Sequence, residues 1–277
     1  MGVFQNNLMG AAAAAASAGG GEFYTHQIAN SVRNSLSQNG TLKRTAGTPT
    51  SRDVFTLSYW VKKYTNTQYA NLFTSGTGGG TYFGTWFTTA GEFNIEGTGG
   101  NWGSANYLVS TALYRDNSAW YHVVTRFDST ESTGSDRVRL YINGVEQTSF
   151  SNSTMHNYVQ NTDFSFINES GVVQSFGGIS GVAIGSEGSD TQLAEIVFND
   201  GQSYGPDSYG ETKNGVWIPK DPSGLTFGDN GYWLKLESSS DLGNDSSGNN
   251  NDFTAANLSA HDQMLDSPTF NSDSNGG

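Results

Sequence analysis

The chain has 277 residues, of which 36 are glycine, 35% are hydrophobic and 13% are aromatic, a composition that favours many short strands over long helices. Cysteine is absent, which excludes disulfide bonds and thiolate metal sites. The formal net charge of −13, with only 13 Lys and Arg, argues against nucleic-acid binding, and no apolar run approaches the roughly 20 residues that cross a bilayer.

The first segment, residues 1–21, contains six consecutive alanines followed by Ser, Ala and three glycines. These side chains bury almost no apolar area, so they cannot offset a backbone entropy of roughly 1–2 kcal/mol per residue. We therefore interpret residues 1–21 as an assembly arm that is ordered by a partner, either another copy of the chain or another protein of a larger particle. The candidate anchors are the larger side chains of the arm: Val3, Phe4, Leu8 and Met9.

The folded body is expected to occupy residues 22–277 as one domain. Residues 22–39 place Ile28, Val32 and Leu36 four positions apart, which fits one or two helical turns as well as an irregular first strand. From residue 54 the run VFTLSYWVKKY alternates with the period of a strand and carries bulky residues on both faces, which predicts a central strand.

Further strands are predicted at 119–128, 137–147, 182–186 and 194–202, with Gly-, Ser- and Thr-rich loops between them. Asn143 and Gly144 stand between two apolar runs, and this pair predicts a type I′ hairpin because both residues tolerate positive φ. From about residue 209 the chain returns to strand pattern only at 232–237 and near 252–258, so we interpret it as an outer wrap of the same domain. The residues expected to be buried are Phe55, Leu57, Trp120, Val123, Leu140, Ile142 and Ile196.

The ordered runs FTLSYWVK, AWYHVVTRFD, VRLYINGVEQ, VAIG and LAEIVFNDG resemble the strand series of laminin-G-like and concanavalin-A-like jelly rolls. The resemblance implies an all-β, two-sheet antiparallel jelly-roll sandwich, with the N-terminal arm outside it. Residues 32–269 also resemble marine bacteriophage structural proteins of this class. That second resemblance implies a virion component, a fibre, appendage or capsid decoration, whose partners are other virion proteins and a glycan on the host surface.

A carbohydrate-active enzyme and a free lectin of the same fold are the alternatives. Retaining glycosidases place two carboxylates about 5–5.5 Å apart, and in this fold they come from an E-x-D-x-x-E strand. Glu92 and Glu96 share a strand face without an acid at position 94, and the pair Glu195 and Asp200 also lacks the middle acid. His122 has no nucleophile or carboxylate beside it at a motif spacing, so we expect a packed histidine. We therefore expect no enzyme activity.

Two groups of residues are candidates for ligand binding. Trp86 and Trp102 lie in Gly-rich segments and are candidates to stack on a sugar, the alternative being that they cap the sandwich or pack against another subunit. Oxygen-bearing side chains crowd the run SDLGNDSSGNNND and are candidate Ca²⁺ ligands, although the same residues also favour tight turns. The candidate Ca²⁺ ligands are Asp241, Asp245, Asn249, Asn251 and Asp252.

Overall fold

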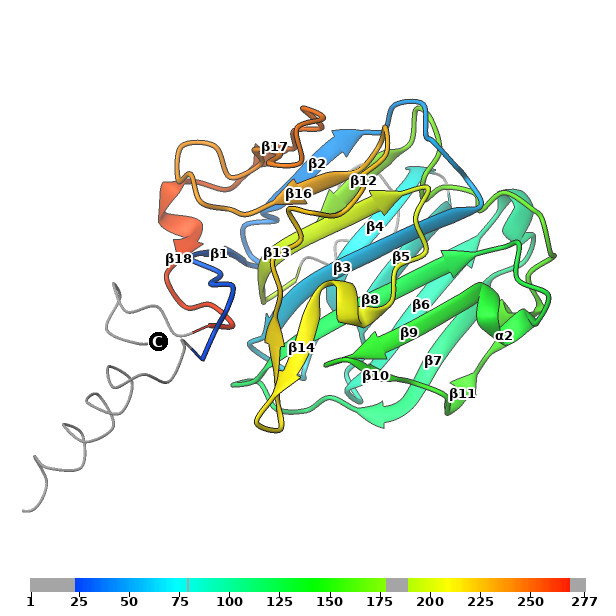
Figure 1. Ribbon diagram of the computed structural model, residues 1–277, viewed down its shortest axis with the longest axis horizontal. Helices are drawn as coiled ribbons and strands as arrows, with labels where there is room; N and C mark the ends of the chain where they lie inside the picture. Colours follow the sequence, from blue (N-terminus) through cyan, green and yellow to red (C-terminus); the bar gives the residue numbers. More distant parts are fainter. Residues whose placement is uncertain (1–22, 79, 178–188, 270–277) are drawn as a thin grey trace, which may run out of the picture.

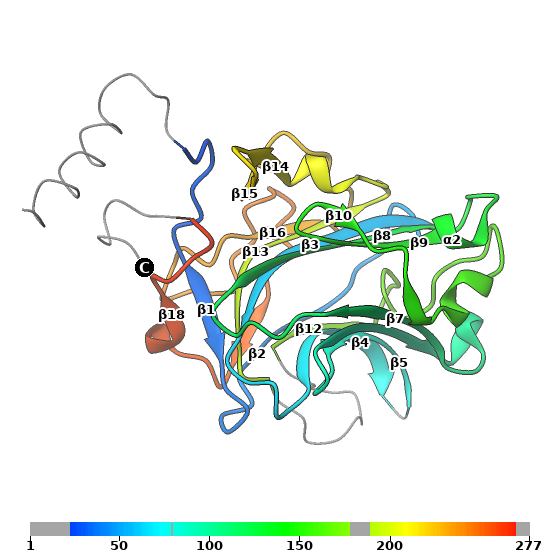
Figure 2. The same ribbon diagram turned by 90° about the horizontal axis from the view of Figure 1, so that it is seen from below.

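The computed structural model of the chain describes residues 23–78, 80–177 and 189–269. Its strands form two eight-stranded sheets that pack face to face as two layers (Figure 1, Figure 2). The described α-helix is a single turn, α2 (Gly134–Arg137), and no described helix is long and apolar enough to cross a membrane. The prediction of an all-β, two-sheet antiparallel sandwich is confirmed.

The first sheet, which we call sheet A, has the strand order β10-β9-β8-β3-β13-β1-β18, with β16 also paired to β13. All its pairs are antiparallel, and β3 lies between β8 and β13, as its two bulky faces predict. The strands of sheet A are β1 (Ser31–Asn34), β3 (Val54–Lys63), β8 (Trp120–Asp128), β9 (Val138–Ile142), β10 (Val145–Glu146), β13 (Thr191–Asp200), β16 (Tyr232–Leu234) and β18 (Gln263–Met264).

The second sheet, sheet B, has the order β11-β7-β6-β5-β4-β12-β2-β17. Its centre lies in residues 70–113, which the sequence pattern assigned mostly to loops; glycines and threonines dilute the strand pattern there. The strands of sheet B are β2 (Thr41–Thr45), β4 (Ala70–Gly78), β5 (Thr81–Phe87), β6 (Glu92–Thr98), β7 (Asn106–Leu113), β11 (Phe150–Asn152), β12 (Val173–Phe176) and β17 (Thr254–Ala256).

A short hairpin, β14 (Gly210–Lys213) with β15 (Val216–Pro219), lies over the side of sheet A that faces away from sheet B (Figure 2). This hairpin therefore covers part of the outer face of sheet A. Short 3-10 turns complete the described elements: η1 (Gly100–Trp102), η2 (Thr154–Asn157), η3 (Pro206–Ser208) and η4 (Ala260–Asp262).

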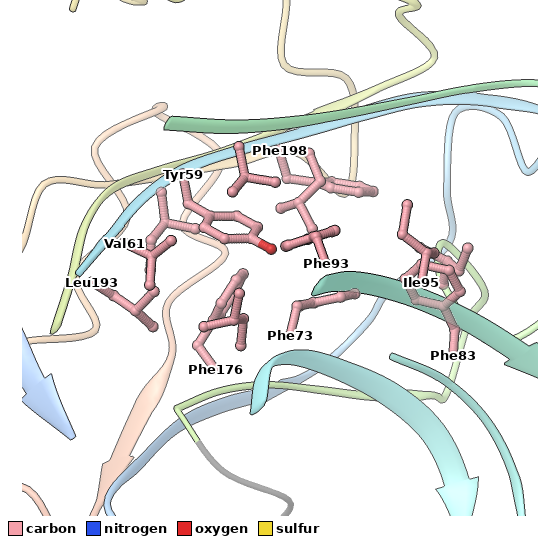
Figure 3. Packing of buried hydrophobic residues seen from close by; sticks show 14 of the residues in the cluster. Tyr59, Val61, Phe73, Phe83, Phe93, Ile95, Phe176, Leu193 and Phe198 are labelled. Atoms are coloured by element: carbon pink, nitrogen blue, oxygen red, sulfur yellow. The ribbon is translucent and has the colours of Figure 1, made fainter. Parts of the chain in front are cut away.

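The main core fills the space between the two sheets, with Tyr59, Phe73, Phe93 and Phe176 pointing into it (Figure 3). Of the residues expected to be buried, all except Trp120 lie in this core. Trp120 is half-buried because it occupies the opposite face of β8 from Val123, against the outer cluster around Trp60. Alternation identified the strand correctly but did not identify which of its faces is inner.

Three local predictions have different outcomes. Asn143 and Gly144 join β9 to β10 with φ of 50° and 77°, so the positive φ predicted for both residues of the turn is confirmed. In residues 22–39 the structure has strand β1, and Val32 pairs with Leu193, so the strand alternative is the correct one. The predicted strand at 182–186 and the arm anchors Val3, Phe4, Leu8 and Met9 lie outside the described residues.

Candidate binding pocket on sheet B

The outer face of sheet B carries a pocket of about 550 Å³, which we call the sheet-B pocket. Its lining comes from four adjacent strands, β4 to β7, with one residue from β11 and two from the segments beside them. The lining is polar and aromatic: Tyr69, Asn71, Thr74, Tyr82, Gly84, Trp86, Thr88, Glu92, Asn94, Glu96, Tyr107, Val109 and Asn152.

The period of two along β5 and β6 separates this lining from the core. On β6, Phe93 and Ile95 enter the core, which leaves Glu92, Asn94 and Glu96 on the outer face. On β5, Phe83 and Phe87 enter the core in the same way. The polar outer faces of neighbouring strands therefore form one continuous surface.

Trp86 lies near the middle of this surface. It pairs across the strands with Asn94, and Asn94 pairs in turn with Val109 of β7. A Cβ atom on Gly84 would lie 3.2 Å from Cζ3 of Trp86, so the indole lies over the glycine and along the sheet. The structure thus places Trp86 in the pocket, in a strand and not in a loop.

Asn94 supplies a hydrogen-bond donor that the protein does not use. The residue is 4% exposed, and its Nδ2 atom has no hydrogen-bond partner among the described residues. A buried donor without a partner costs about 1–3 kcal/mol, so most such groups in native proteins are paired with protein or water. Asn94 lines the pocket, so a rotation of its amide toward the pocket would present this donor to an acceptor on a bound molecule.

Two carboxylates flank Asn94 along β6. Burial raises the pKa of Glu96, and hydrogen bonds from the hydroxyls of Tyr82 and Tyr107 offset part of this rise. At the other end, Thr88 Oγ1 donates to Glu92 Oε2 at 3.1 Å. The pocket therefore offers hydrogen-bond acceptors on both sides of a central donor.

The carboxylates predicted to be non-catalytic lie in two different sheets. On an extended strand, the Cα atoms of Glu92 and Glu96 are about 13 Å apart, with the amide of Asn94 between them. Glu195 lies in sheet A, where it accepts from Trp233 Nε1 at 2.5 Å and interrupts β13 with a bulge and a φ of 46°. Asp200 accepts from the backbone N–H groups of Thr50, Ser51 and Asn230. Glu195 Oε1 also lies 3.3 Å from His26 Nε2. Neither Glu195 nor Asp200 lines the sheet-B pocket.

Trp102, the second sugar-stacking candidate, is part of the core. It is 4% exposed, its Nε1 donates to the Ser165 carbonyl at 2.9 Å, and its ring lies 4.5 Å from that of Tyr158. A Cβ on Gly97 would come within 2.4 Å of the indole, so the glycine makes room for it. No face of this ring is free for a sugar, which corrects the expectation for Trp102 and leaves Trp86 alone at the pocket.

The candidate Ca²⁺ loop is instead held by its own hydrogen bonds. The Asp245 carboxylate accepts from the backbone N–H groups of Trp233, Ser247 and Asn251, and Asp252 accepts from the N–H of Asp245. Asn249 Nδ2 donates to the carbonyls of Gly228 and Gly231, which turns its amide toward the backbone.

Asp241 is exposed at the start of the same loop. Across the described residues, no three His, Asp or Glu side chains converge in a way that could hold a metal ion. The hydrogen bonds of the loop are those of the alternative, a set of tight turns, and Ca²⁺ binding stays a prediction.

His122 is packed, as expected from the absence of a motif around it. Trp217 Nε1 donates to its Nδ1 at 3.0 Å, so the proton resides on Nε2, which lies 2.9 Å from Ser58 Oγ. Burial lowers the pKa of His122 to about 3, so the ring is neutral at ordinary pH.

Comparison with known proteins identifies the family. Residues 36–184 match the model of the concanavalin A-like lectin/glucanases superfamily, of the laminin-G-like type. The chain belongs to this family. No curated protein matches the sequence.

Several solved structures are similar to the chain at low sequence identity. A putative carbohydrate-binding protein from Bacteroides ovatus is similar to the chain with a TM-score of 0.53 and 15% identity, over 84% of this chain and 61% of that one. A heptameric SAP-like pentraxin from Limulus polyphemus has a TM-score of 0.45 and 16% identity, over 65% of this chain and 80% of that one. The CBM40 of the Ruminococcus gnavus IT-sialidase, bound to sialyllactose, has a TM-score of 0.37 and 16% identity over 52% and 75%.

Sequence reasoning missed most of the pocket. Asn71, Asn94, Tyr82 and Tyr107 were not singled out, and Glu96 was considered only as a catalytic candidate. A signal was present: the polar series Glu92, Asn94, Glu96 alternates with the core residues between them. Two such strands in succession predict that the outer face of the sheet is polar. They do not predict that this face contains a pocket.

Proposed function

We propose that the chain is a carbohydrate-binding protein that holds a glycan in the sheet-B pocket and does not cleave it. The observation that carries this proposal is the buried, unpartnered Nδ2 of Asn94 beside the indole of Trp86. Sugars offer what this pair requires, since their hydroxyls accept hydrogen bonds and their C–H faces stack on aromatic rings. The family membership and the fold shared with a putative carbohydrate-binding protein support the same proposal.

Binding can be tested with a glycan array, followed by calorimetric titration of the best oligosaccharide. We expect Trp86→Ala and Asn94→Ala each to weaken binding by about tenfold or more, which corresponds to about 1.4 kcal/mol. Phe23→Ala is the matched control, because Phe23 is an exposed aromatic residue (37%) outside the pocket. Equal affinity in wild type and both pocket variants would place the glycan elsewhere.

We further propose that the protein is displayed on a bacteriophage particle, as a fibre, appendage or capsid decoration, and that the bound glycan belongs to the host surface. The resemblance of residues 32–269 to phage structural proteins supports this part of the proposal. A labelled antibody should detect the protein on purified particles, and the free pocket ligand should inhibit adsorption. A free lectin would remain in the supernatant when the particles are sedimented.

A glycoside hydrolase is the second candidate, because Glu92 and Glu96 both line the pocket and burial raises the pKa of Glu96. The amide at position 94 and the tyrosine partners of Glu96 favour binding over cleavage. We expect no release of reducing sugar from any array ligand, measured over hours with concentrated protein. Turnover that is lost in Glu96→Gln and retained in Glu195→Gln would establish the enzyme instead.

A further inference from the structure

We infer that the sheet-B pocket selects uncharged sugars and rejects sugars that carry a carboxylate, sulfate or phosphate group. This inference rests on the proposed function and adds to it the chemical class of the ligand. It is carried by the distribution of charge around the pocket, by the hydrogen bonds already formed within it, and by the buried donor of Asn94 that has no partner among the described residues.

The pocket contains no cation. All 13 Lys and Arg of the chain lie within the described residues, and none of them lines the pocket. Arg115 lies beside the turn between β5 and β6, where its Nε donates to the Ala90 carbonyl at 3.0 Å. Lys63 lies under the sheet, with its Nζ 4.7 Å from the ring centre of the core residue Phe87. An anionic sugar would therefore enter without a charged partner.

The pocket does contain two anions, Glu92 and Glu96, which lie on either side of Asn94. A charged group on a sugar bound at Asn94 would be within about one Debye length, roughly 8 Å at physiological salt, of at least one of them. The net charge of −13 adds a long-range repulsion of the same sign. The hydroxyls of Tyr82 and Tyr107, which could otherwise have served an anion, already donate to Glu96.

An uncharged sugar can pair with both the amide donor and the carboxylate acceptors of the pocket. Each hydroxyl can accept from Asn94 Nδ2 and donate to a carboxylate oxygen at the same time, because it carries a donor and two acceptor positions. A sulfate or carboxylate group offers acceptors only. It would match Asn94 and leave Glu92 facing another anion, and burial of like charges without a counterion is strongly unfavourable.

The experiment uses the full-length protein and pairs of glycans that differ by an anionic group. An array of such pairs is followed by titration with lactose against 3′-sialyllactose and with neutral agaro-oligosaccharides against sulfated carrageenan oligosaccharides. We expect the neutral member of every bound pair to bind about tenfold or more tightly at low salt, with a smaller ratio at high salt. Equal or tighter binding of the anionic member, still dependent on Trp86, overturns this inference and leaves the proposed function intact. Binding of no glycan overturns both.

A charge-neutralising variant tests the cause of the selectivity. Glu92→Gln keeps the shape of the side chain and should reduce the neutral-to-anionic ratio by about threefold or more at low salt. Asp229→Asn is the matched control, because it removes one carboxylate at an exposed position outside the pocket and should leave the ratio within about twofold. An unchanged ratio in Glu92→Gln would show that shape rejects the anions and would overturn the electrostatic inference.

Discussion

The two sheets have similar inner faces but very different outer faces. The outer face of sheet A carries Trp60, His122 and Val197 and is covered by the C-terminal wrap. The outer face of sheet B carries tyrosines, amides and carboxylates around Trp86, and it contains the pocket. In a sandwich, an outer face with apolar residues requires a cover, whereas a polar face can stay in contact with water. The polar face is therefore the one available to a ligand.

The C-terminal region packs closely against the outer face of sheet A. His122 stacks between Trp60, at 4.7 Å, and Trp217 of the β14–β15 hairpin, at 5.9 Å between ring centres. Gly144 lies directly under the Trp217 ring, because a Cβ there would approach the ring to 2.4 Å. Trp86, by contrast, lies over Gly84 on a face that the C-terminal region does not cover, and this contrast leads to four predictions.

Truncating one tryptophan on each face should produce the largest difference. Trp60 is 4% exposed, so Trp60→Ala is expected to lower the free energy of unfolding by about 3–5 kcal/mol through a cavity. Trp86→Ala should lower it by less than about 1 kcal/mol, because the ring is only partly buried, and should reduce glycan binding. Chemical denaturation monitored by circular dichroism measures both values. A comparable loss of stability in the two variants would mean that Trp86 is a structural residue.

Acid should destabilise the covered face through His122, whose pKa burial lowers to about 3 from 6.5. Between pH 3 and pH 6.5 the unfolded chain binds a proton at this residue and the folded chain does not. The free energy of unfolding is therefore highest above pH 6.5 and decreases as the pH falls toward 3. At pH 5 the loss is about 2 kcal/mol. Chemical denaturation of the wild type at pH 5 and at pH 8 should show this difference in the free energy of unfolding.

The matched variant is His122→Gln, in which this pH dependence should be absent. His26 contributes with the opposite sign: burial lowers its pKa, but the hydrogen bond and charge of Glu195 outweigh burial and raise it. Its contribution is present below pH 6.5 and is lost as the pH rises through the raised pKa. An unchanged pH dependence in His122→Gln would assign the effect to other groups.

The wrap should depend on hydrogen bonds and not on a metal. Asp245→Asn is expected to lower stability by about 1 kcal/mol, because an amide replaces a charged acceptor of several N–H groups. Addition of EDTA or of millimolar Ca²⁺ should leave the melting temperature unchanged. A rise in melting temperature with Ca²⁺ that is absent in Asp245→Asn would support the metal hypothesis instead.

The smallest effect on the folded body is expected from deletion of residues 2–21. The melting temperature should stay within about 2 °C of the full-length value, because the deleted side chains bury little apolar area. Self-association and incorporation into particles should be lost, as measured by light scattering and sedimentation with particles. Normal assembly of the truncated chain would show that the arm is not an assembly element.

The sequence predicted the sheet with the strongest alternation and missed the sheet that carries the pocket. β3, β8 and the hairpin at Asn143 were identified because β-branched and aromatic residues mark their period of two. β5 and β6 were missed as parts of a sheet because Gly84 and Gly97 interrupt the pattern, although each glycine makes room for a tryptophan ring. Pattern alone could not separate Trp86 from Trp102, since both stand near glycines, and Trp102 is buried by residues distant in the sequence, Tyr158 and Phe164.

The two ends of the described chain meet at one edge of sheet A. The Thr269 hydroxyl accepts from the N–H of Ile28 at 2.9 Å, and β1 pairs with β18, so segments more than 200 residues apart lie side by side (Figure 1). A body whose polypeptide enters and leaves at one point can be spliced into a surface loop of a host protein, or circularly permuted, without separating its sheets. The same edge is where a stretching force would act first, and it would separate β1 from β18 before it reached the strands of the sheet-B pocket.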